Sequence, residues 1–285
     1  MKVVTTTAEL RIQLAESRRA GKSVALVPTM GCLHAGHARL IREARSLADI
    51  VVVSIYVNPL QFGPSEDFSR YPRSFDADAE ICAVEGADII FHPHNLYPED
   101  GPKVTLTVRE LGDSLCGATR PGHFDGVATV VAILFNAVQP DIAVFGEKDW
   151  QQLAIIRRMV ADLHMPLEIV GVQTVREADG LAMSSRNRYL NDVELEKSIA
   201  LSAALRAMQT QVANGERDVP AIKAVGHRLL LESGIEPEYL DIRDAGSLKA
   251  LDSLNGNPAR AFVAARIGRA RLIDNIPIET MTETP

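Results

Sequence analysis

The chain has 285 residues, of which 46% are hydrophobic and 24% charged. These proportions are typical of a folded globular protein with one large or two ordinary domains. The net charge of −7 argues against a nucleic-acid partner, because an excess of Lys and Arg is needed to neutralise a phosphate backbone, but it leaves room for a local pocket for a small anion.

The sequence also indicates where the protein works. The first residues lack the apolar run and cleavage site of a secretory signal, and the longest apolar stretch, near residues 127–138, is shorter than the roughly 20 residues of a membrane span. The three cysteines are Cys32, Cys82 and Cys116, and no two of them form a Cys-x-x-Cys pair. We therefore expect a reduced, cytoplasmic protein with no membrane contact and no disulfide framework.

Short apolar runs predict five strands that are buried on both faces of a sheet. In chain order they lie at Val24–Val27, Ile50–Val57, Asp88–Phe91, Ile142–Phe145 and Glu168–Val172. Between them, apolar residues at spacings of three and four predict helices with one buried stripe each. The stripes are Leu40, Ile41, Ala44, Leu47 and Ala48; Val127, Val130, Val131, Leu134, Phe135 and Val138; and Leu153, Ile156, Met159, Val160 and Leu163. This alternation predicts an α/β fold, a Rossmann-like parallel sheet with helices on both faces, which binds ligands beyond the carboxyl ends of its strands.

The pattern changes after residues 175–190. Two long helical patterns follow, at Asp192–Asn214 and Val219–Ser233, and then strand-like pieces at Tyr239–Arg243, Ala261–Ile267 and Leu272–Ile273. Helices followed by strands predict a separate, smaller C-terminal α+β domain. We place the two domains at residues 1–176 and 177–285, and we expect the last four residues (282–285) to be frayed.

The segment VPTMGCLHAGHARLIREA, residues 27–44, joins a predicted strand to a predicted helix and carries Gly31, His34, Gly36 and His37. Backbone N–H groups and the helix dipole at such a joint suit a phosphate, and two imidazoles would add further donors. A zinc site would need a third or fourth ligand, which no neighbouring motif supplies. From these residues alone a phosphate contact, a metal site and a plain turn all stay open.

Two further segments offer cations and hydroxyl groups. In FGEKDWQQL, residues 145–153, Lys148 follows the end of a strand, where it suits a phosphate, and Asp149 suits the N-cap of the next helix. In GLAMSSRNRYL, residues 180–190, Ser184, Ser185 and Arg186 suit a mobile loop that closes over a polyphosphate. A polar linker between domains would look similar.

Polar groups in two other segments are less specific. Asn58 and Gln61 follow the second strand and are able to bind a hydroxyl-rich acid. Asp76 and Asp78 would suit Mg²⁺, or equally the solvated start of a helix. The segment RPGHFDGV, residues 120–127, is either a loop that closes on a ligand or only the entry to a helix.

In this order, the segments resemble the pantothenate synthetase (pantoate–β-alanine ligase) family over nearly the whole chain. The resemblance is carried by PTMGCLHAGH, VNPLQFG, YPR, RPGHFDGV, FGEKDWQQL, VREADGLAMSSRNRYL and ARLIDN. The family belongs to the nucleotidyltransferase group, which shares a HIGH-type signature with class I aminoacyl-tRNA synthetases. HAGH corresponds to that signature and MSSRN to the mobile KMSKS-type loop. Asp125 departs from the basic or small residue expected in the GHFDGV loop, and Cys32 stands at a variable position.

The resemblance implies a two-step ligation in which pantoate and ATP give pantoyl adenylate and pyrophosphate, and β-alanine then gives pantothenate and AMP. It implies catalytic roles for His34, His37, Lys148 and Arg186, with His37 acting either as a proton donor or only as a hydrogen-bond donor. The ATP-binding residues that it implies are Met30, Gly31, His34, Gly36, His37, Gly146, Glu147, Lys148, Asp149, Val175, Met183, Ser184, Ser185 and Arg186. Pantoate would be held by Gln61 and Gln152, with Met30 and Asn58 nearby.

The resemblance further implies that Mg²⁺ arrives with the ATP phosphates and not in a protein-held metal site, and that the enzyme is a homodimer. Other functions remain as rivals. A cytidylyltransferase would share the histidine turn but would not need Gln61 and Gln152. A tRNA synthetase would need an extended basic surface, and an idle nucleotide-binding module would not need both histidines, Lys148 and the Ser-Ser-Arg loop.

Overall fold

The computed structural model describes residues 1–64 and 66–278, and the chain divides into two compact units. The first unit comprises Met1–Glu147 and Ile155–Gln173, and the second comprises Lys148–Ala154 and the chain from Thr174 onward. The C-terminal tail that we expected to be frayed lies outside the described residues. No helix in the described part of the chain is both long enough and apolar enough to cross a membrane.

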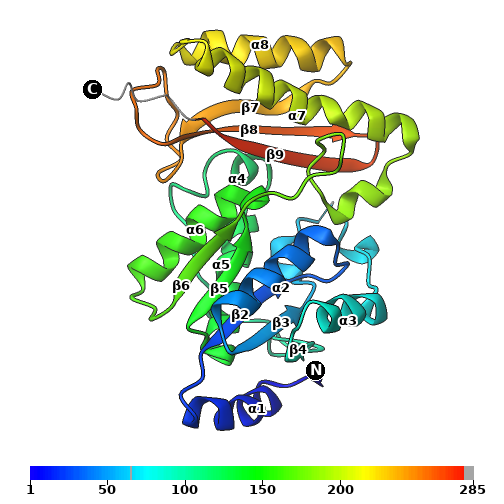
Figure 1. The fold of residues 1–285 in the computed structure, drawn as a ribbon, viewed down its shortest axis with the longest axis vertical. Coiled ribbons are helices and arrows are strands. Elements are labelled where there is room, and N and C mark those ends of the chain that lie inside the picture. The colour runs from blue at the N-terminus through cyan, green and yellow to red at the C-terminus, as the bar shows by residue number, and fades with distance from the viewer. Residues whose placement is uncertain (65, 279–285) are drawn as a thin grey trace. The chain divides into compact units, whose positions relative to one another are not determined.

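The first unit is built on a six-stranded sheet in which every neighbouring pair of strands is parallel (Figure 1). The strands are β1 (Lys2–Val4), β2 (Val24–Thr29), β3 (Ile50–Ile55), β4 (Ile89–Phe91), β5 (Ile142–Gly146) and β6 (Glu168–Val172), in the order β1-β4-β3-β2-β5-β6. Strand β2 is central, since Ala25 pairs with Val51 of β3 on one side and with Ile142 of β5 on the other. The order in which the chain adds strands to the sheet therefore reverses between β2 and β5, which is the switch point of the fold.

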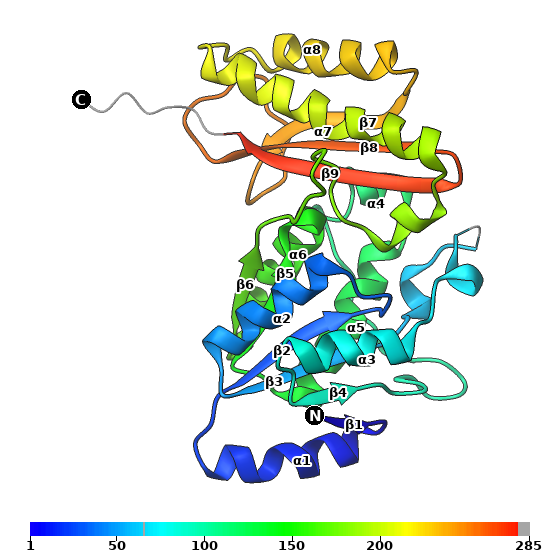
Figure 2. The same cartoon turned by 45° about the vertical axis from the view of Figure 1, so that its right-hand side comes forward.

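Helices cover both faces of this sheet, as the alternation predicted. Helices α2 (Ala35–Leu47) and α3 (Phe75–Val84) contact each other on one face, whereas α1 (Thr7–Arg19) and α5 (His123–Val138) contact each other on the opposite face (Figure 2). The remaining helices are the short α4 (Cys116–Thr119) and α6 (Trp150–Asp162). The apolar stripe predicted for α5 is buried along its whole length.

Two stripe residues were wrongly predicted to be buried. Leu47 is 40% exposed and Leu163 is 50% exposed. The reason is that Leu47 is the last residue of α2 and Leu163 follows the end of α6, so neither has a following turn to cover it. The sequence pattern also left β1 and α1 unpredicted, although Thr6 and Glu9 form a capping box at the start of α1.

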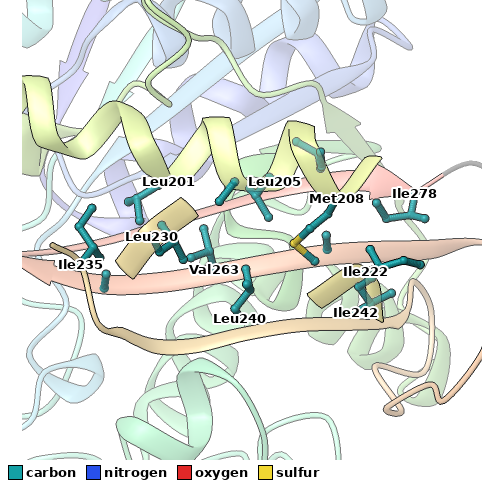
Figure 3. Packing of buried hydrophobic residues seen from close by; sticks show 14 of the residues in the cluster. Leu201, Leu205, Met208, Ile222, Leu230, Ile235, Leu240, Ile242, Val263 and Ile278 are labelled. Carbon is teal, nitrogen blue, oxygen red and sulfur yellow. The ribbon is translucent and has the colours of Figure 1, made fainter. Parts of the chain in front are cut away.

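The second unit is an α+β arrangement of two helices on a three-stranded antiparallel sheet (Figure 1). Its helices are α7 (Asp192–Ala213) and α8 (Val219–Glu232), and its strands are β7 (Pro237–Asp244), β8 (Ala259–Ile267) and β9 (Ala270–Ile278), in the order β7-β8-β9. Buried apolar side chains from both layers form one core, which includes Leu205 and Met208 of α7 and Val263 of β8 (Figure 3). The predicted parallel α/β and smaller α+β architectures are confirmed.

Candidate active site

Three predicted site segments of the first unit begin at the carboxyl ends of adjacent strands. The histidine turn follows β2, the segment with Asn58 and Gln61 follows β3, and Gly146 and Glu147 lie at the end of β5. Parallel strands end at the same edge of a sheet, and ligands of such sheets bind beyond that edge at the switch point. The topology therefore brings these sequence-distant segments to one edge, as the sequence predicted.

His34 and His37 form the start of α2. His34 is the N-cap residue, and its Nδ1 atom accepts a hydrogen bond from the backbone N–H of Gly36 at 3.1 Å. Nδ1 of His37 accepts from the backbone N–H of His34 at 3.3 Å, which completes a capping box built from two histidines. The two ring centroids are 4.1 Å apart. The two histidines, a residue pair that suits a phosphate, thus also cap the N-terminus of α2.

These two bonds fix the tautomer of both rings. A neutral imidazole has one N–H and one acceptor nitrogen, and in both rings the acceptor is Nδ1 because a backbone N–H points at it. The hydrogen of each neutral ring therefore resides on Nε2. His34 and His37 each carry one N–H donor, and the N-terminus of α2 adds partial positive charge beside them.

Asp78 holds the turn that precedes α2. It is only 1% exposed, and its two oxygens accept from the backbone N–H groups of Cys32 at 2.8 Å and Leu33 at 2.7 Å. One oxygen also accepts from the Ser74 hydroxyl at 3.2 Å. The approach is close enough that a Cβ atom at Gly31, where φ is +80°, would lie 2.9 Å from the Asp78 carboxylate. Asp78 is thus engaged by the backbone, while Asp76 is exposed in the first turn of α3.

Asn58 fixes the orientation of Gln61. Oδ1 of Asn58 accepts from the Leu60 backbone N–H at 3.2 Å and from the Tyr97 hydroxyl at 2.6 Å. Its Nδ2 group donates to the Gly126 carbonyl and to Oε1 of Gln61, each at 3.1 Å. Nδ2 of Asn58 is a donor only, so Gln61 must present Oε1 to it, which leaves the Gln61 N–H groups as the available donors. Nε2 of Gln61 lies 3.1 Å from the sulfur of Met30.

The segment RPGHFDGV, residues 120–127, enters α5 at His123 and is tied to the backbone of Gln61. Arg120 donates to both oxygens of Glu66 at 2.6 Å and to the Gln61 carbonyl at 3.2 Å, and Nδ1 of His123 lies 2.9 Å from the same carbonyl. Burial acts to raise the pKa of Glu66, but the hydrogen bond and charge of Arg120 outweigh it, so the pKa lies below its ordinary value. Asp125, in the first turn of α5, accepts from the Val108 backbone N–H at 2.8 Å.

A cavity of about 400 Å³ lies in the first unit beside the histidine turn and the segment that follows β3. Met30 and Gly31 of the histidine turn line it, together with aromatic side chains and Arg73. His92 also lines it, and its Nδ1 atom lies 2.8 Å from the carbonyl of Ile55, as befits a structural loop residue. The cavity gives a small molecule room to enter next to Met30.

The second unit holds the other predicted phosphate-binding residues. Lys148 and Asp149 lie in a short 3₁₀ turn, Glu147–Asp149, directly before α6, with the Lys148 ammonium 3.9 Å from the Asp149 carboxylate. The carbonyl of Lys148 accepts from Nδ2 of Asn275 at 2.8 Å. Gln152 lies half-buried in the first turn of α6.

The loop that contains Ser184, Ser185 and Arg186 closes a narrow hairpin. The backbone N–H of Met183 donates to the carbonyl of Val175 at 3.0 Å, so these two predicted ATP-binding residues face each other. Oγ of Ser184 accepts from the backbone N–H of Arg186 at 3.2 Å and caps the 3₁₀ helix Ser185–Tyr189. A small cavity is lined by Lys148 and Ser184 together with Asn187 and Asp274, so the lysine and the serine loop meet within this unit.

Sequence reasoning missed the residues that hold these segments in place. Glu66, Tyr97 and Arg176 were not singled out, and Asp78 was interpreted as a magnesium ligand or a solvated acid. A signal was present for Asp78, because it lies four residues before the buried Cys82 and so on the buried stripe of α3. Within residues 1–64 and 66–278, no three His, Cys, Asp or Glu side chains are placed to hold one metal ion.

A parallel sheet whose switch point carries a histidine-capped helix places the chain in the class of Rossmann-like α/β proteins. The family can be stated more narrowly. The model of the pantoate-beta-alanine ligase family matches residues 2–277, and the chain belongs to this family of enzymes.

Individual relatives agree with the family match. The chain is 52% identical to pantothenate synthetase 1 of Bradyrhizobium diazoefficiens, over 97% of this chain and 98% of that protein. It is 49% identical to pantothenate synthetase of Geobacter sulfurreducens, over 96% and 98%. A crystal structure of pantothenate synthetase from Thermus thermophilus has a TM-score of 0.92 at 45% identity, and the match covers 98% of this chain and 100% of that one.

A second solved structure is that of pantoate-beta-alanine ligase from Francisella tularensis, described as complexed with beta-gamma ATP and beta-alanine. Its TM-score is 0.81 at 31% identity, and the match covers 97% of each chain. The likeness thus extends over both compact units of the chain.

Proposed function

We propose that this enzyme joins pantoate to β-alanine at the expense of ATP, through a pantoyl-adenylate intermediate. The observation that carries the proposal is the match to the pantoate-beta-alanine ligase family over residues 2–277. In the first step a carboxylate oxygen of pantoate bonds to the α-phosphorus of ATP and pyrophosphate leaves. In the second step the amine of β-alanine bonds to the acyl carbon, AMP leaves, and the amine loses a proton to solvent.

The first step brings an anion to a polyanion, so the enzyme must position both and stabilise charge on the phosphates. We propose that His34 and His37 donate their Nε2–H groups to phosphate oxygens. His37 acts as a hydrogen-bond donor and not as an acid. An imidazolium would carry hydrogen on Nδ1 as well, and that hydrogen would face the His34 backbone N–H, which donates to the same atom.

Lys148, Ser184, Ser185 and Arg186 supply the cations and hydroxyl groups that bind the triphosphate in this proposal. Charge-assisted hydrogen bonds of this kind are each worth roughly 1.5–3 kcal/mol. The backbone near Gly31, Gly36 and Gly146, with Glu147 and Asp149, completes the ATP contacts, and Val175 and Met183 border the nucleotide. Residues 177–285 act as the lid domain, which begins with the Ser184–Arg186 loop.

Pantoate is recognised by the amide groups of Gln61 and Gln152, next to Met30. The N–H groups of Gln61 suit the carboxylate and hydroxyl oxygens of pantoate, because the bond from Asn58 to the Gln61 oxygen fixes the orientation of the amide. The hydrogen bonds of Asn58 to Leu60, Tyr97, Gly126 and Gln61 use both its donor hydrogens and both acceptor sites of its oxygen. We therefore assign Asn58 the role of orienting Gln61.

We propose that Mg²⁺ enters with the phosphates of ATP. The acid at hand does not suit a resident ion, since Asp78 is committed to the Cys32 and Leu33 backbone. We also propose that the enzyme works in the cytoplasm, which its buried, unbridged cysteines support, and as a homodimer, which sedimentation of the purified protein tests.

One assay tests the function. Exchange of labelled pyrophosphate into ATP, with and without pantoate, reports adenylate formation, and release of AMP on addition of β-alanine reports the second step. We expect exchange that requires pantoate. Exchange that ignores pantoate overturns the substrate assignment and favours a nucleotidyltransferase of another kind, whereas no exchange with any acid favours an idle nucleotide-binding module.

A further inference from the structure

Strand β9 carries two consecutive polar residues that are buried. Asp274 and Asn275 are each only 3% exposed. The alternation of side chains along β9 places Asp274 on the same face as Leu272 and Ile276, both of which belong to the apolar core of the second unit. Burying a carboxylate at such a position costs free energy unless the group is paired, so its hydrogen-bond partners show what holds it there.

Asn275 holds the turn that contains Lys148. Nε of Arg260 donates to Oδ1 of Asn275, and since Arg260 is a donor only, this bond fixes the orientation of the amide. Nδ2 of Asn275 therefore faces the Lys148 carbonyl, to which it donates at 2.8 Å. The Arg260 guanidinium also lies 3.6 Å from the ring centroid of Trp150, whose Nε1 atom donates to the Ala245 carbonyl at 2.8 Å.

Asp274 holds the loop that contains Ser184. Its two oxygens accept from Arg176 at 2.6 and 2.9 Å in a bidentate pair. Arg176 also donates to the carbonyl of Gly180 at 3.0 Å, and it pairs with Ala182 across the hairpin. The backbone of this hairpin leads directly to Ser184, and Asp274 lines the same small cavity as Lys148 and Ser184.

Two consecutive residues of one strand thus fix two segments that are 36 residues apart in the sequence, Lys148 and Ser184. We propose that Asp274 and Asn275 are positioning residues for adenylation, which set the distance between the Lys148 ammonium and the Ser184–Arg186 loop. This inference rests on the proposed function, which gives both segments to ATP. Displacement of a phosphate-binding group by about 1 Å is enough to slow such a reaction by ~10²-fold.

The test is pantoate-dependent pyrophosphate exchange by the full chain carrying Asn275→Ala or Asn275→Asp. Asn275→Asp keeps the shape of the side chain and its bond from Arg260 but removes the donor to Lys148. We expect both variants to lose ~10–10²-fold in kcat, with the KM for pantoate changed less than about twofold. Gln209→Ala is the matched control, because Gln209 donates at 3.0 Å to the carbonyl of Pro277 on the same strand and touches neither segment.

The arm that runs through Asp274 is tested with Arg176→Lys. Lysine keeps the charge beside Asp274 but cannot form the bidentate pair or reach Gly180 with the same fork. We expect a loss of ~10-fold in kcat with the pantoate KM unchanged. Normal kcat in Arg176→Lys overturns the role of Asp274.

The double variant Lys148→Ala/Asn275→Ala separates positioning from a general structural effect. If Asn275 acts through Lys148, removing it from the Lys148→Ala enzyme costs no further rate, whereas independent effects multiply. Multiplied losses, or a normal kcat in both Asn275 variants, overturn the inference. A normal exchange rate in Lys148→Ala alone instead overturns the proposed role of Lys148, so the two failures are distinguishable.

Discussion

The backbone N–H of His34 donates to Nδ1 of His37 across 3.3 Å, so the N-cap residue of α2 fixes the ring of the third residue in the helix. This bond makes the neutral His37 ring a donor through Nε2. The same ring caps the start of α2 and has the catalytic role that we propose, so a substitution must be chosen to keep the first role while testing the second.

His37→Gln is that substitution. Glutamine at the third helical position keeps a capping-box acceptor for the His34 N–H, and its amide N–H groups replace the imidazole donor. We expect His37→Ala to lose at least ~10²-fold in pyrophosphate exchange and His37→Gln to recover ~10-fold of that loss. An acid role instead predicts that glutamine is as inactive as alanine.

Asp78 and Asp76 provide a matched pair in one helix. The Asp78 carboxylate accepts hydrogen bonds from the backbone N–H groups of Cys32 and Leu33. Asparagine at position 78 would turn an NH₂ group toward one of these two N–H groups and leave that N–H buried without a partner. We expect Asp78→Asn to lower the free energy of unfolding by about 2–3 kcal/mol and to slow pyrophosphate exchange. Asp76→Asn changes an exposed acid in the first turn of α3 and should cost no more than about 1 kcal/mol with normal exchange.

Urea unfolding and exchange assays of the two variants measure these effects. Equal stability losses at both positions would contradict the anchoring role of Asp78. A loss of exchange in Asp76→Asn, reversed by raised Mg²⁺, would instead return the magnesium interpretation to Asp76.

Features that depend on local sequence were predictable, whereas contacts between residues far apart in the sequence were not. The predicted strand Glu168–Val172 agrees with β6 at both ends, because a short apolar run is a local signal. Its predicted burial on both faces was wrong, because β6 is an edge strand and only Val172 of it is buried. The histidine turn was equally local. In contrast, Asp78 meets Cys32 across 46 residues and Arg120 meets Glu66 across 54, and such pairs depend on which strands lie side by side. A single sequence does not state that order, so the strand and the turn that rest on local signals were predictable and these long-range contacts were not.

Glu66 and Arg120 give the molecule a pH-dependent support for Gln61. The folded pKa of Glu66 lies below its ordinary value of 4.5, so the pair adds stability above that pH and loses it as pH falls through the folded pKa. The stability difference between wild type and Glu66→Gln should therefore be largest at neutral pH and shrink on acidification from about pH 5. The control is Glu43→Gln, which breaks an exposed i,i+4 pair with Arg39 and should cost only about 0.3–0.5 kcal/mol.

Denaturant titrations at several pH values measure both differences. A difference for Glu66→Gln that grows on acidification would mean that the carboxyl group is stabilised in its protonated form, contrary to its contacts with Arg120. Since Arg120 also donates to the Gln61 carbonyl, we expect Glu66→Gln to raise the KM for pantoate more than the KM for ATP.

Asn58 donates to Oε1 of Gln61, which fixes the orientation of the amide, and we propose that the Nε2 group of Gln61 donates to pantoate. Gln61→Glu keeps the bond from Asn58 but replaces this donor with a carboxylate oxygen, which repels the carboxylate of pantoate. Gln61→Ala only removes the donor. We therefore expect the KM for pantoate to rise by about tenfold in Gln61→Ala and further in Gln61→Glu, with the KM for ATP changed less than about twofold in either. Gln152→Ala should likewise impair pantoate use more than ATP binding. Steady-state kinetics with each substrate varied in turn decide the matter, since an equal rise in both KM values would place these glutamines outside the acid pocket.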